Sequence, residues 1–132
     1  MLRPRAQLAD GLSYIHGGHG RFTLVGRERR FTYRLSRSDD DKLTFVKVLS
    51  GPDNEQDYTY IGFITEAGDR LVAGRKGRPD APSFKALDWW LHHPNHPGVE
   101  FWHEGSCCKC GRTLTNPESI ARGIGPHCAG DL

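Results

Sequence analysis

Polar and apolar residues follow a period of two over much of the first half of the chain. Four segments alternate or cluster β-branched and aromatic residues in the manner of strands, namely residues 21–25, 30–36, 43–49 and 58–65. The connections are short and rich in turn-forming residues, such as Gly-Pro-Asp-Asn at 51–54. Because short connections join neighbouring antiparallel strands, we expect a meander, to which residues 70–73 add a short fifth strand.

After residue 80 the apolar spacing becomes helical. Four large apolar side chains fall on one stripe, namely Phe84, Leu87, Trp90 and Leu91. Asp80 or Ser83 is expected to cap the start of this helix, and Pro94 to end it. The stripe predicts one helix packed across the sheet.

The last thirty residues contain all four cysteines of the chain. The spacing is His-x3-Cys-x2-Cys-x17-Cys, with His103, Cys107, Cys110 and Cys128 as its members. Two cysteines separated by two residues place both thiolates on one tight turn, and two more distant ligands complete the tetrahedral cage that zinc prefers. We therefore predict a zinc site formed by these four residues.

The fourth ligand has alternatives. His103 is favoured by ligand spacing, whereas His127 and Cys108 are the other candidates. Adjacent cysteines rarely face one metal, which disfavours Cys108. A pair of disulfides is the alternative to a metal, but the vicinal Cys107 and Cys108 would make such pairing strained.

The predicted zinc ion is structural rather than catalytic. Glu104 and Glu118 are candidates for a general base, but single carboxylates in a turn-rich segment are usually solvated. No Ser-His-Asp, paired-carboxylate or phosphate-binding pattern is visible, so we expect no enzyme activity and no small-molecule substrate.

The run CGRTLTNPESIARGIGPHCAG resembles a zinc-ribbon-type family of unknown function found in bacteriophage and actinobacterial proteins. The family pattern is C-x2-C-G-R-x-L-T-x-P-x-S-I-x-x-G-I-G-P-x-C. The matching positions include all three spaced cysteines, Cys107, Cys110 and Cys128, with Gly111, Arg112, Leu114, Pro117 and residues 123–126 among the others. The segment FWHEG before the run also resembles phage members, which supports His103 as a ligand. The resemblance implies a zinc module in a phage-type protein but no activity.

The 132 residues suit one compact unit with a small appendage. We predict an α+β fold, with an antiparallel meander of four to five strands, one packed helix and a C-terminal zinc knuckle. Residues 1–20 form a flexible arm, residues 21–98 the sheet and helix, and residues 99–132 the knuckle module packed on them. No apolar stretch suits a membrane span or a signal peptide, so we expect a cytoplasmic protein, in the host cytoplasm if it is phage-encoded.

Charge is segregated along the chain, although the net charge is only +2. Residues 1–38 hold eight arginines against two acids, and residues 39–69 hold eight acids against two lysines. A dense acidic face competes with nucleic acid, so one hypothesis is a phage factor that binds a host protein complex, such as a polymerase, a nuclease or a CRISPR effector.

The alternative hypothesis is a nucleic-acid-binding module. Its candidate contacts are the basic residues of two loops, Arg75, Lys76, Arg78, Lys109 and Arg112. If exposed on the sheet, aromatic side chains would stack on bases, with Phe22, Tyr33, Tyr58 and Tyr60 as candidates. The alternative, which is more common for such residues, places them in the core.

Overall fold

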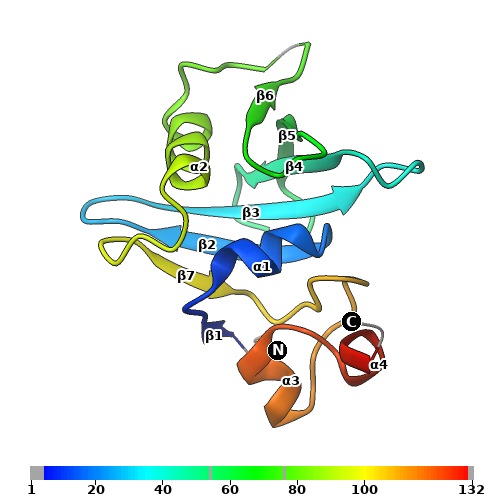
Figure 1. Ribbon diagram of the computed structural model, residues 1–132. Helices are drawn as coiled ribbons and strands as arrows, with labels where there is room; N and C mark the ends of the chain where they lie inside the picture. The colour runs from blue at the N-terminus through cyan, green and yellow to red at the C-terminus, as the bar shows by residue number, and fades with distance from the viewer. Residues whose placement is uncertain (1–4, 54, 76, 131–132) are drawn as a thin grey trace.

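The computed structural model describes residues 5–53, 55–75 and 77–130. Within this part of the chain, seven strands form one antiparallel sheet in the order β1-β7-β2-β3-β4-β5-β6 (Figure 1). The strands are β1 (Ala6–Gln7), β2 (Gly20–Val25), β3 (Arg30–Arg37), β4 (Thr44–Leu49), β5 (Tyr58–Ile64), β6 (Leu71–Ala73) and β7 (Glu100–His103). The helices are α1 (Gly11–His16), α2 (Pro82–His92), α3 (Pro117–Arg122) and α4 (Pro126–Gly130). The predicted α+β class is confirmed, with a larger sheet than expected.

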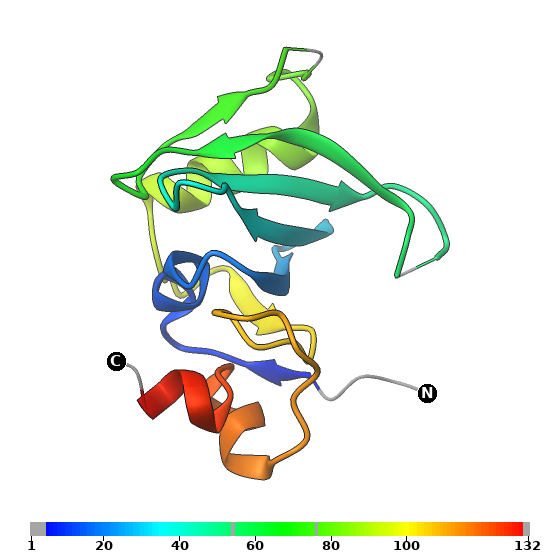
Figure 2. The ribbon, with the colours of Figure 1, turned by 90° about the vertical axis from the view of Figure 1, so that its right-hand side faces the viewer.

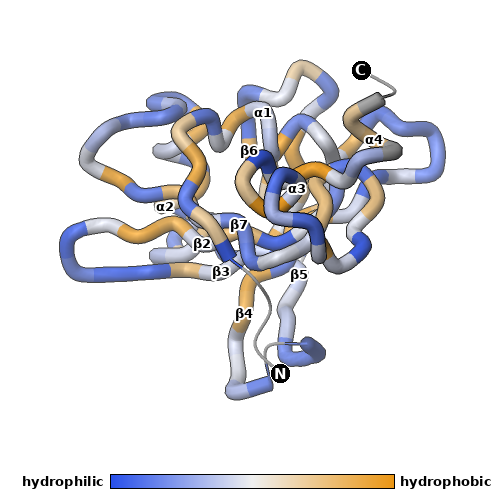
Figure 3. The backbone as a smooth tube through the Cα atoms, turned by 90° about the horizontal axis from the view of Figure 1, so that it is seen from below, coloured by the Kyte–Doolittle hydropathy of each residue, from blue (hydrophilic) through white to orange (hydrophobic). Residues whose placement is uncertain are grey.

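The meander from β2 to β6 follows the predicted segments closely. Each strand pairs with the next, and the alternation places one set of side chains in the core, with Tyr33, Leu35 and Val46 at most 3% exposed. Polar residues occupy the hairpin ends, which are blue in the hydropathy tube of Figure 3. This part of the fold is set by local sequence, since each turn connects strands adjacent in the chain.

Helix α2 is confirmed as the packed helix, and all four residues of its predicted stripe are buried. Its start differs from the prediction, because Ala81 is the N-cap residue and makes no side-chain capping bond. Pro82 instead occupies the first turn, where the absence of an N–H is tolerated. The Tyr33 hydroxyl donates to the Ser83 carbonyl at 2.6 Å and joins the helix to the sheet.

The N-terminal segment is not a flexible arm over its described residues 5–20. Strand β1 pairs with β7, and α1 buries Tyr14 and Ile15 in the core. Asp10 caps α1 by accepting from the Ser13 N–H, while the Asn95 side chain accepts from the Gly11 N–H at 2.8 Å. The glycines around His16 and His19 predicted a flexible arm. Burial of Tyr14 and Ile15 instead holds this segment on the sheet. Residues 1–4 of the predicted arm lie outside the described residues.

The sheet is helix-covered on one face. Helices α1 and α2 pack against the face that carries Phe22, Tyr33 and Phe101, and α3 and α4 lie beyond the β1–β7 edge (Figures 1 and 2). Phe22 and Tyr33 are therefore core residues, the more common of the two positions considered for these aromatics, and they are not available for stacking. No helix of the described residues is long and apolar enough to cross a membrane.

Tyr14 joins three parts of the fold through one buried hydroxyl. It donates to the Ser106 carbonyl at 2.7 Å and lies 3.1 Å from both the carbonyl and the N–H of Arg21. We expect Tyr14→Phe to lower the free energy of unfolding by about 1–3 kcal/mol, because buried backbone groups lose their partner while the ring stays. Urea denaturation measures this change.

The matched control is Tyr60→Phe, which removes the same hydroxyl from a side chain that is 41% exposed. This variant should unfold within about 0.5 kcal/mol of the parent protein. Equal losses in both variants would contradict the role assigned to the Tyr14 hydroxyl.

Candidate metal centre

A short hairpin places Cys107 and Cys110 on one turn. Ser106 and Thr113 form an antiparallel bridge, and the Cys107 N–H donates to the Arg112 carbonyl at 2.8 Å. The turn closes through Gly111, whose N–H donates to the Cys107 carbonyl at 2.9 Å. Gly111 has a φ of +79°, a conformation that costs a residue with a side chain more than glycine. The knuckle predicted from the Cys-x2-Cys spacing is therefore present.

The third cysteine comes from the short helix α4. Helix α3 ends at Arg122 and is capped by Gly123, which is left-handed with a φ of +74° and whose N–H donates to the Ser119 carbonyl at 2.7 Å. The Gly123 carbonyl then accepts from the Cys108 N–H at 3.0 Å and fastens this bend to the knuckle. Helix α4 begins at Pro126 and carries Cys128 toward the turn.

The ligand atoms of Cys107, Cys110 and Cys128 lie within 4.8 Å of one another. A tetrahedral zinc ion with bonds of about 2.3 Å requires sulfur atoms about 3.8 Å apart, so small adjustments suffice. Cys107 is fully buried, Cys128 is half-buried and Cys110 is exposed. The cluster fits a thiolate-preferring metal at the surface of the module.

Backbone amides prepare the Cys107 sulfur for a metal. The N–H groups of Gly125 and Lys109 donate to this sulfur at 3.3 and 3.4 Å. Burial alone would raise the pKa of the Cys107 thiol, but these bonds and the interactions with the backbone and thiol of Cys110 outweigh it and hold the pKa below its ordinary value. The Gly-Ile-Gly-Pro run of residues 123–126 supplies one of these donors, a role that the sequence pattern did not predict.

The Cys128 thiol is the least acidic of the cluster thiols for which a pKa shift is found. Its partial burial, and then its proximity to the other two thiols, raise the pKa of Cys128 to about 11. Three adjacent thiolates repel one another, so all three ionise together only when a cation neutralises them.

Cys108 does not join the cluster. Its side chain is buried, and burial is the main cause that raises the pKa of this thiol to about 12. It lines a groove of about 880 Å³ together with Tyr14 and His19, on the α1 side of the knuckle. As expected for vicinal cysteines, only one of the pair belongs to the metal cluster.

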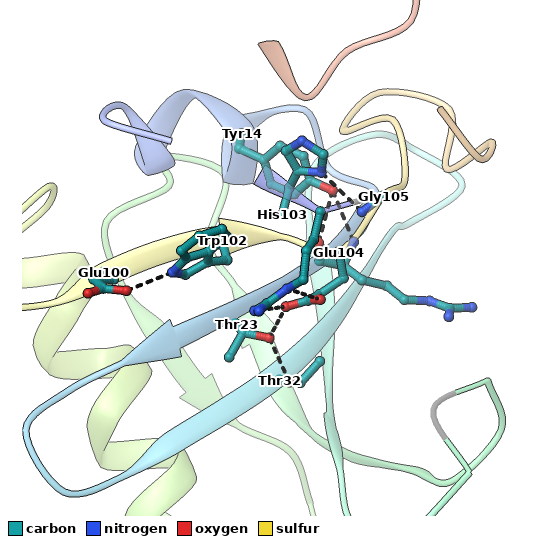
Figure 4. Close-up of polar contacts among 10 residues, drawn as sticks. Tyr14, Thr23, Thr32, Glu100, Trp102, His103, Glu104 and Gly105 are labelled. Atoms are coloured by element: carbon teal, nitrogen blue, oxygen red, sulfur yellow. Dashed lines mark hydrogen bonds and ion pairs between the residues drawn. The ribbon is translucent and has the colours of Figure 1, made fainter. Parts of the chain in front are cut away.

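His103 is not brought to the cysteines, contrary to the predicted ligand set. It lies in β7, fully buried, with its ring stacked on Tyr14 at 5.8 Å (Figure 4). Nδ1 accepts from the Gly105 N–H at 3.0 Å, and Nε2 lies 2.5 Å from the Ile120 carbonyl. Because a carbonyl only accepts, Nε2 holds the proton and the imidazole is neutral. Both ring nitrogens are thus engaged away from the metal.

The other candidate ligand, His127, lies in α4, but its side chain is outside the part of the chain that the structure describes. Among the described residues the cluster therefore supplies three protein ligands, and all three are sulfur atoms.

Glu104 has a structural role on the opposite side of β7 from His103. Arg5 donates to its two carboxylate oxygens at 3.0 and 2.9 Å, and the Thr23 hydroxyl donates to it as well (Figure 4). A carboxylate held by three donors is poorly suited to act as a general base.

The predicted nucleic-acid contacts fall on two distant loops. Arg75 and Arg78 belong to the β6–α2 connection, whereas Lys109 and Arg112 belong to the knuckle, at the opposite end of the molecule in Figures 1 and 2. Arg78 lies 4.0 Å from Asp80, with both side chains exposed. Lys76 lies outside the described residues. These residues do not form one basic surface.

We expect the single variants Cys107→Ser, Cys110→Ser and Cys128→Ser to lose stoichiometric zinc, since each removes one of three sulfur ligands. Metal analysis of the purified protein by mass spectrometry measures this loss. Cys108→Ser is the matched control and should retain one zinc ion per chain. If Cys108→Ser loses zinc while Cys107→Ser retains it, Cys108 is the ligand and the assignment of Cys107 is wrong.

His103→Gln should retain zinc but change how stability depends on pH. Burial lowers the pKa of His103, so the unfolded state binds its proton more readily than the folded state. The neutral ring thus stabilises the fold fully above the unfolded pKa of about 6.5, and this contribution falls as pH decreases below that value.

Denaturation in saturating zinc between pH 7.5 and 5 should therefore show a smaller loss of stability for His103→Gln than for the parent protein. Loss of zinc on acidification affects both proteins and cancels in the difference. Parallel pH profiles, or loss of zinc in the variant at pH 7.5, would contradict this assignment of His103.

Residues 100–132 match the model of a family described as a family of unknown function, DUF6011, over about a quarter of the chain. No curated protein and no solved structure matches the sequence. The segment after β6 and α2 that contains the cysteine cluster is thus similar to a family without an assigned activity.

Proposed function

We propose that Cys107, Cys110 and Cys128 hold a structural zinc ion, and that the chain is a non-enzymatic, zinc-containing protein that binds a macromolecular partner. The observation that carries the metal assignment is the convergence of three sulfur atoms from two separate segments, the knuckle turn and α4. Soft thiolate ligands in a tight cluster favour zinc over magnesium or calcium, which prefer oxygen.

A structural role follows from where the ligands lie. Two ligands are on the knuckle turn and the third is on α4, so a bound ion links segments separated by seventeen residues. The module has few buried apolar side chains of its own, with Leu114 and Ile124 among them. Zinc modules of this size gain about 10–16 kcal/mol from metal binding, enough to hold such a segment in place.

The contacts of the carboxylate beside the knuckle, among the described residues, support the proposed role without catalysis. Glu104, the carboxylate closest to the knuckle in sequence on the β7 side, is occupied by Arg5 and Thr23. The exposed Cys110 lies on a turn at the surface, where water is not excluded from a bound metal.

The positions of the acidic residues in the fold help to choose between a host protein complex and nucleic acid as the proposed partner. The acidic residues 39–41 lie in the β3–β4 turn, whereas Asp53, Glu55 and Asp57 lie between β4 and β5, at the other end of β4. A six-residue strand separates these ends by about 20 Å, so the acids do not form one continuous face. This separation weakens the case for a phage factor that binds a host complex, such as a CRISPR effector, through acidic mimicry. Nucleic acid is the partner class that we favour.

Removal of zinc should loosen the C-terminal module while leaving the sheet folded. In hydrogen exchange, chelator-treated protein is expected to lose amide protection across residues 105–130, because the knuckle and α4 lose their link, whereas β2 to β5 keep theirs. Zinc-loaded protein is the reference, and the Cys108→Ser variant should respond in the same way. Unchanged protection throughout would exclude a structural role for the metal.

A further inference from the structure

The face of the sheet opposite α1 and α2 is free of helices among the described residues. On β7, His103 points to Tyr14 of α1, while the flanking Glu104 binds Thr23 on the other side of the sheet (Figure 4). The same alternation sends Tyr33 and Leu35 into the core and Arg34 outward. We call this outward surface the open face, and its centre consists of Arg21, Arg34, Lys47, Tyr58 and Tyr60.

Three positive side chains lie directly opposite one another across adjacent strands of the open face. The register pairs Arg21 with Arg34, Arg34 with Lys47, and Lys47 with Tyr60. Like charges at directly opposed positions destabilise a sheet. Strand pairing by itself therefore does not relieve the repulsion within this row.

Only one end of the basic row is neutralised within the described part of the chain. Glu55 lies 3.1 Å from Arg21, whereas no carboxylate of the described residues forms an ion pair with Arg34 or Lys47. The Arg34 guanidinium lies instead over the Tyr58 ring, 6.0 Å from its centre. Arg34 and Lys47 therefore present two adjacent positive charges to solvent.

Aromatic rings border these charges. Tyr60 is 41% exposed and lies edge-on to Phe45, with ring centres 6.2 Å apart. Phe45 in turn is opposite Phe63 on the next strand, and both are half-buried. The open face thus combines cations that lack an acid partner among the described residues with a partly exposed aromatic ring, Tyr60.

We propose, building on the macromolecule-binding role above, that the open face binds single-stranded nucleic acid. Arg34 and Lys47 contact phosphates, and Tyr60 stacks on a base. A single strand offers both a negative backbone and exposed base faces, whereas a duplex hides those faces inside its stack. An open antiparallel sheet with basic and aromatic side chains matches this ligand better than it matches an acidic peptide, which lacks successive flat rings.

The test measures fluorescence anisotropy of labelled oligonucleotides with zinc-loaded, full-length protein in 50 mM salt. The probes are single-stranded DNA, single-stranded RNA and a DNA duplex. We expect saturable binding of the single strands, weaker binding of the duplex, and affinity that falls as salt rises to 200 mM. The ratio of RNA to DNA affinity identifies which single strand the face prefers, since only RNA has the 2′-hydroxyl.

Variants locate the site. Tyr60→Ala should weaken binding about 5- to 150-fold, the loss expected for one base-stacking contact, while Tyr60→Phe retains the ring and the affinity. Arg34→Gln and Lys47→Gln should each reduce the slope of log affinity against log salt by about 1. Arg29→Gln removes an equal charge from the exposed β2–β3 turn and should bind like the parent protein.

Stability distinguishes a binding role from a structural one. Because Arg34→Gln and Lys47→Gln relieve repulsion between opposed cations, neither variant should lower the melting temperature even though each weakens binding. If Arg34 and Lys47 only stabilised the fold, their replacement would lower the melting temperature and leave the oligonucleotide affinity unchanged.

The proposal is overturned if neither single strand binds in 50 mM salt, if the duplex binds as tightly as the single strands, or if the Arg34, Lys47 and Tyr60 variants bind like the parent. It is also overturned if Arg78→Gln and Arg112→Gln weaken binding while Lys47→Gln does not. Zinc content is measured on the same samples. If the protein holds one zinc ion per chain but binds no oligonucleotide, the open-face proposal fails and the proposed metal centre stands. If the protein binds the oligonucleotides but takes up no zinc, the metal centre alone is refuted.

Discussion

The pairing of β7 with β2 is the constraint on which the rest of the structure depends. It joins Phe22 to His103 and Val25 to Glu100 across about eighty residues of chain. Bringing such distant segments together costs chain entropy. Burial of aromatic rings offsets that cost, because Phe101 stacks on Phe22 with ring centres 4.7 Å apart and contacts Tyr14 and Trp90 as well. Once β7 is in place, β1 adds to its other edge, and the knuckle begins directly after its last residue.

The C-terminal module is attached to this edge at points separate from the metal cluster. The Ile120 carbonyl binds the His103 ring, the Ser106 carbonyl binds the Tyr14 hydroxyl, and the Cys108 carbonyl accepts from the His19 N–H at 2.8 Å. These bonds hold the module on the sheet, whereas the three sulfur atoms connect the two ends of the module to each other. The metal and the buried polar contacts therefore stabilise different interfaces, which explains why a histidine so close to the knuckle is not a ligand.

The elements that depend on residues close together in the chain are predicted well from the sequence. Alternation and turn residues are local signals, so the strands from β2 to β6 and the stripe of α2 fall where the pattern places them. The Cys-x2-Cys turn is also local, and its glycine at 111 is where the left-handed backbone occurs. The third sulfur comes from Cys128, which is distant from the turn in sequence, but its spacing from Cys110 was sufficient to predict its place in the cluster.

What the sequence could not predict depends on contacts between distant residues. Strands β1 and β7 have two and four residues, too short for a periodic signal, and they exist through pairing with each other and with β2. His103 has the spacing of a ligand, yet the Ile120 carbonyl and the Gly105 amide occupy its nitrogens. The basic residues of the two loops were counted along the chain, but the fold separates them and assembles a different basic row on the sheet.

Other polar groups on the outward surface of this sheet have partners within the fold, whereas Arg34 and Lys47 of the basic row have no acid partner among the described residues. At the β1–β7 edge, Arg5 lies over the Trp102 ring, 4.7 Å from its centre, and its guanidinium is matched by both oxygens of Glu104. On the same outward surface, Thr23 bonds Thr32 across the strands. Outward polar groups at this edge thus have partners within the fold. In the centre of the same surface, Arg34 and Lys47 face each other across neighbouring strands without an acid of the described residues. Because one part of the surface is internally paired and the adjacent part is not, Arg34 and Lys47 are the outward charges that the proposed single strand would contact.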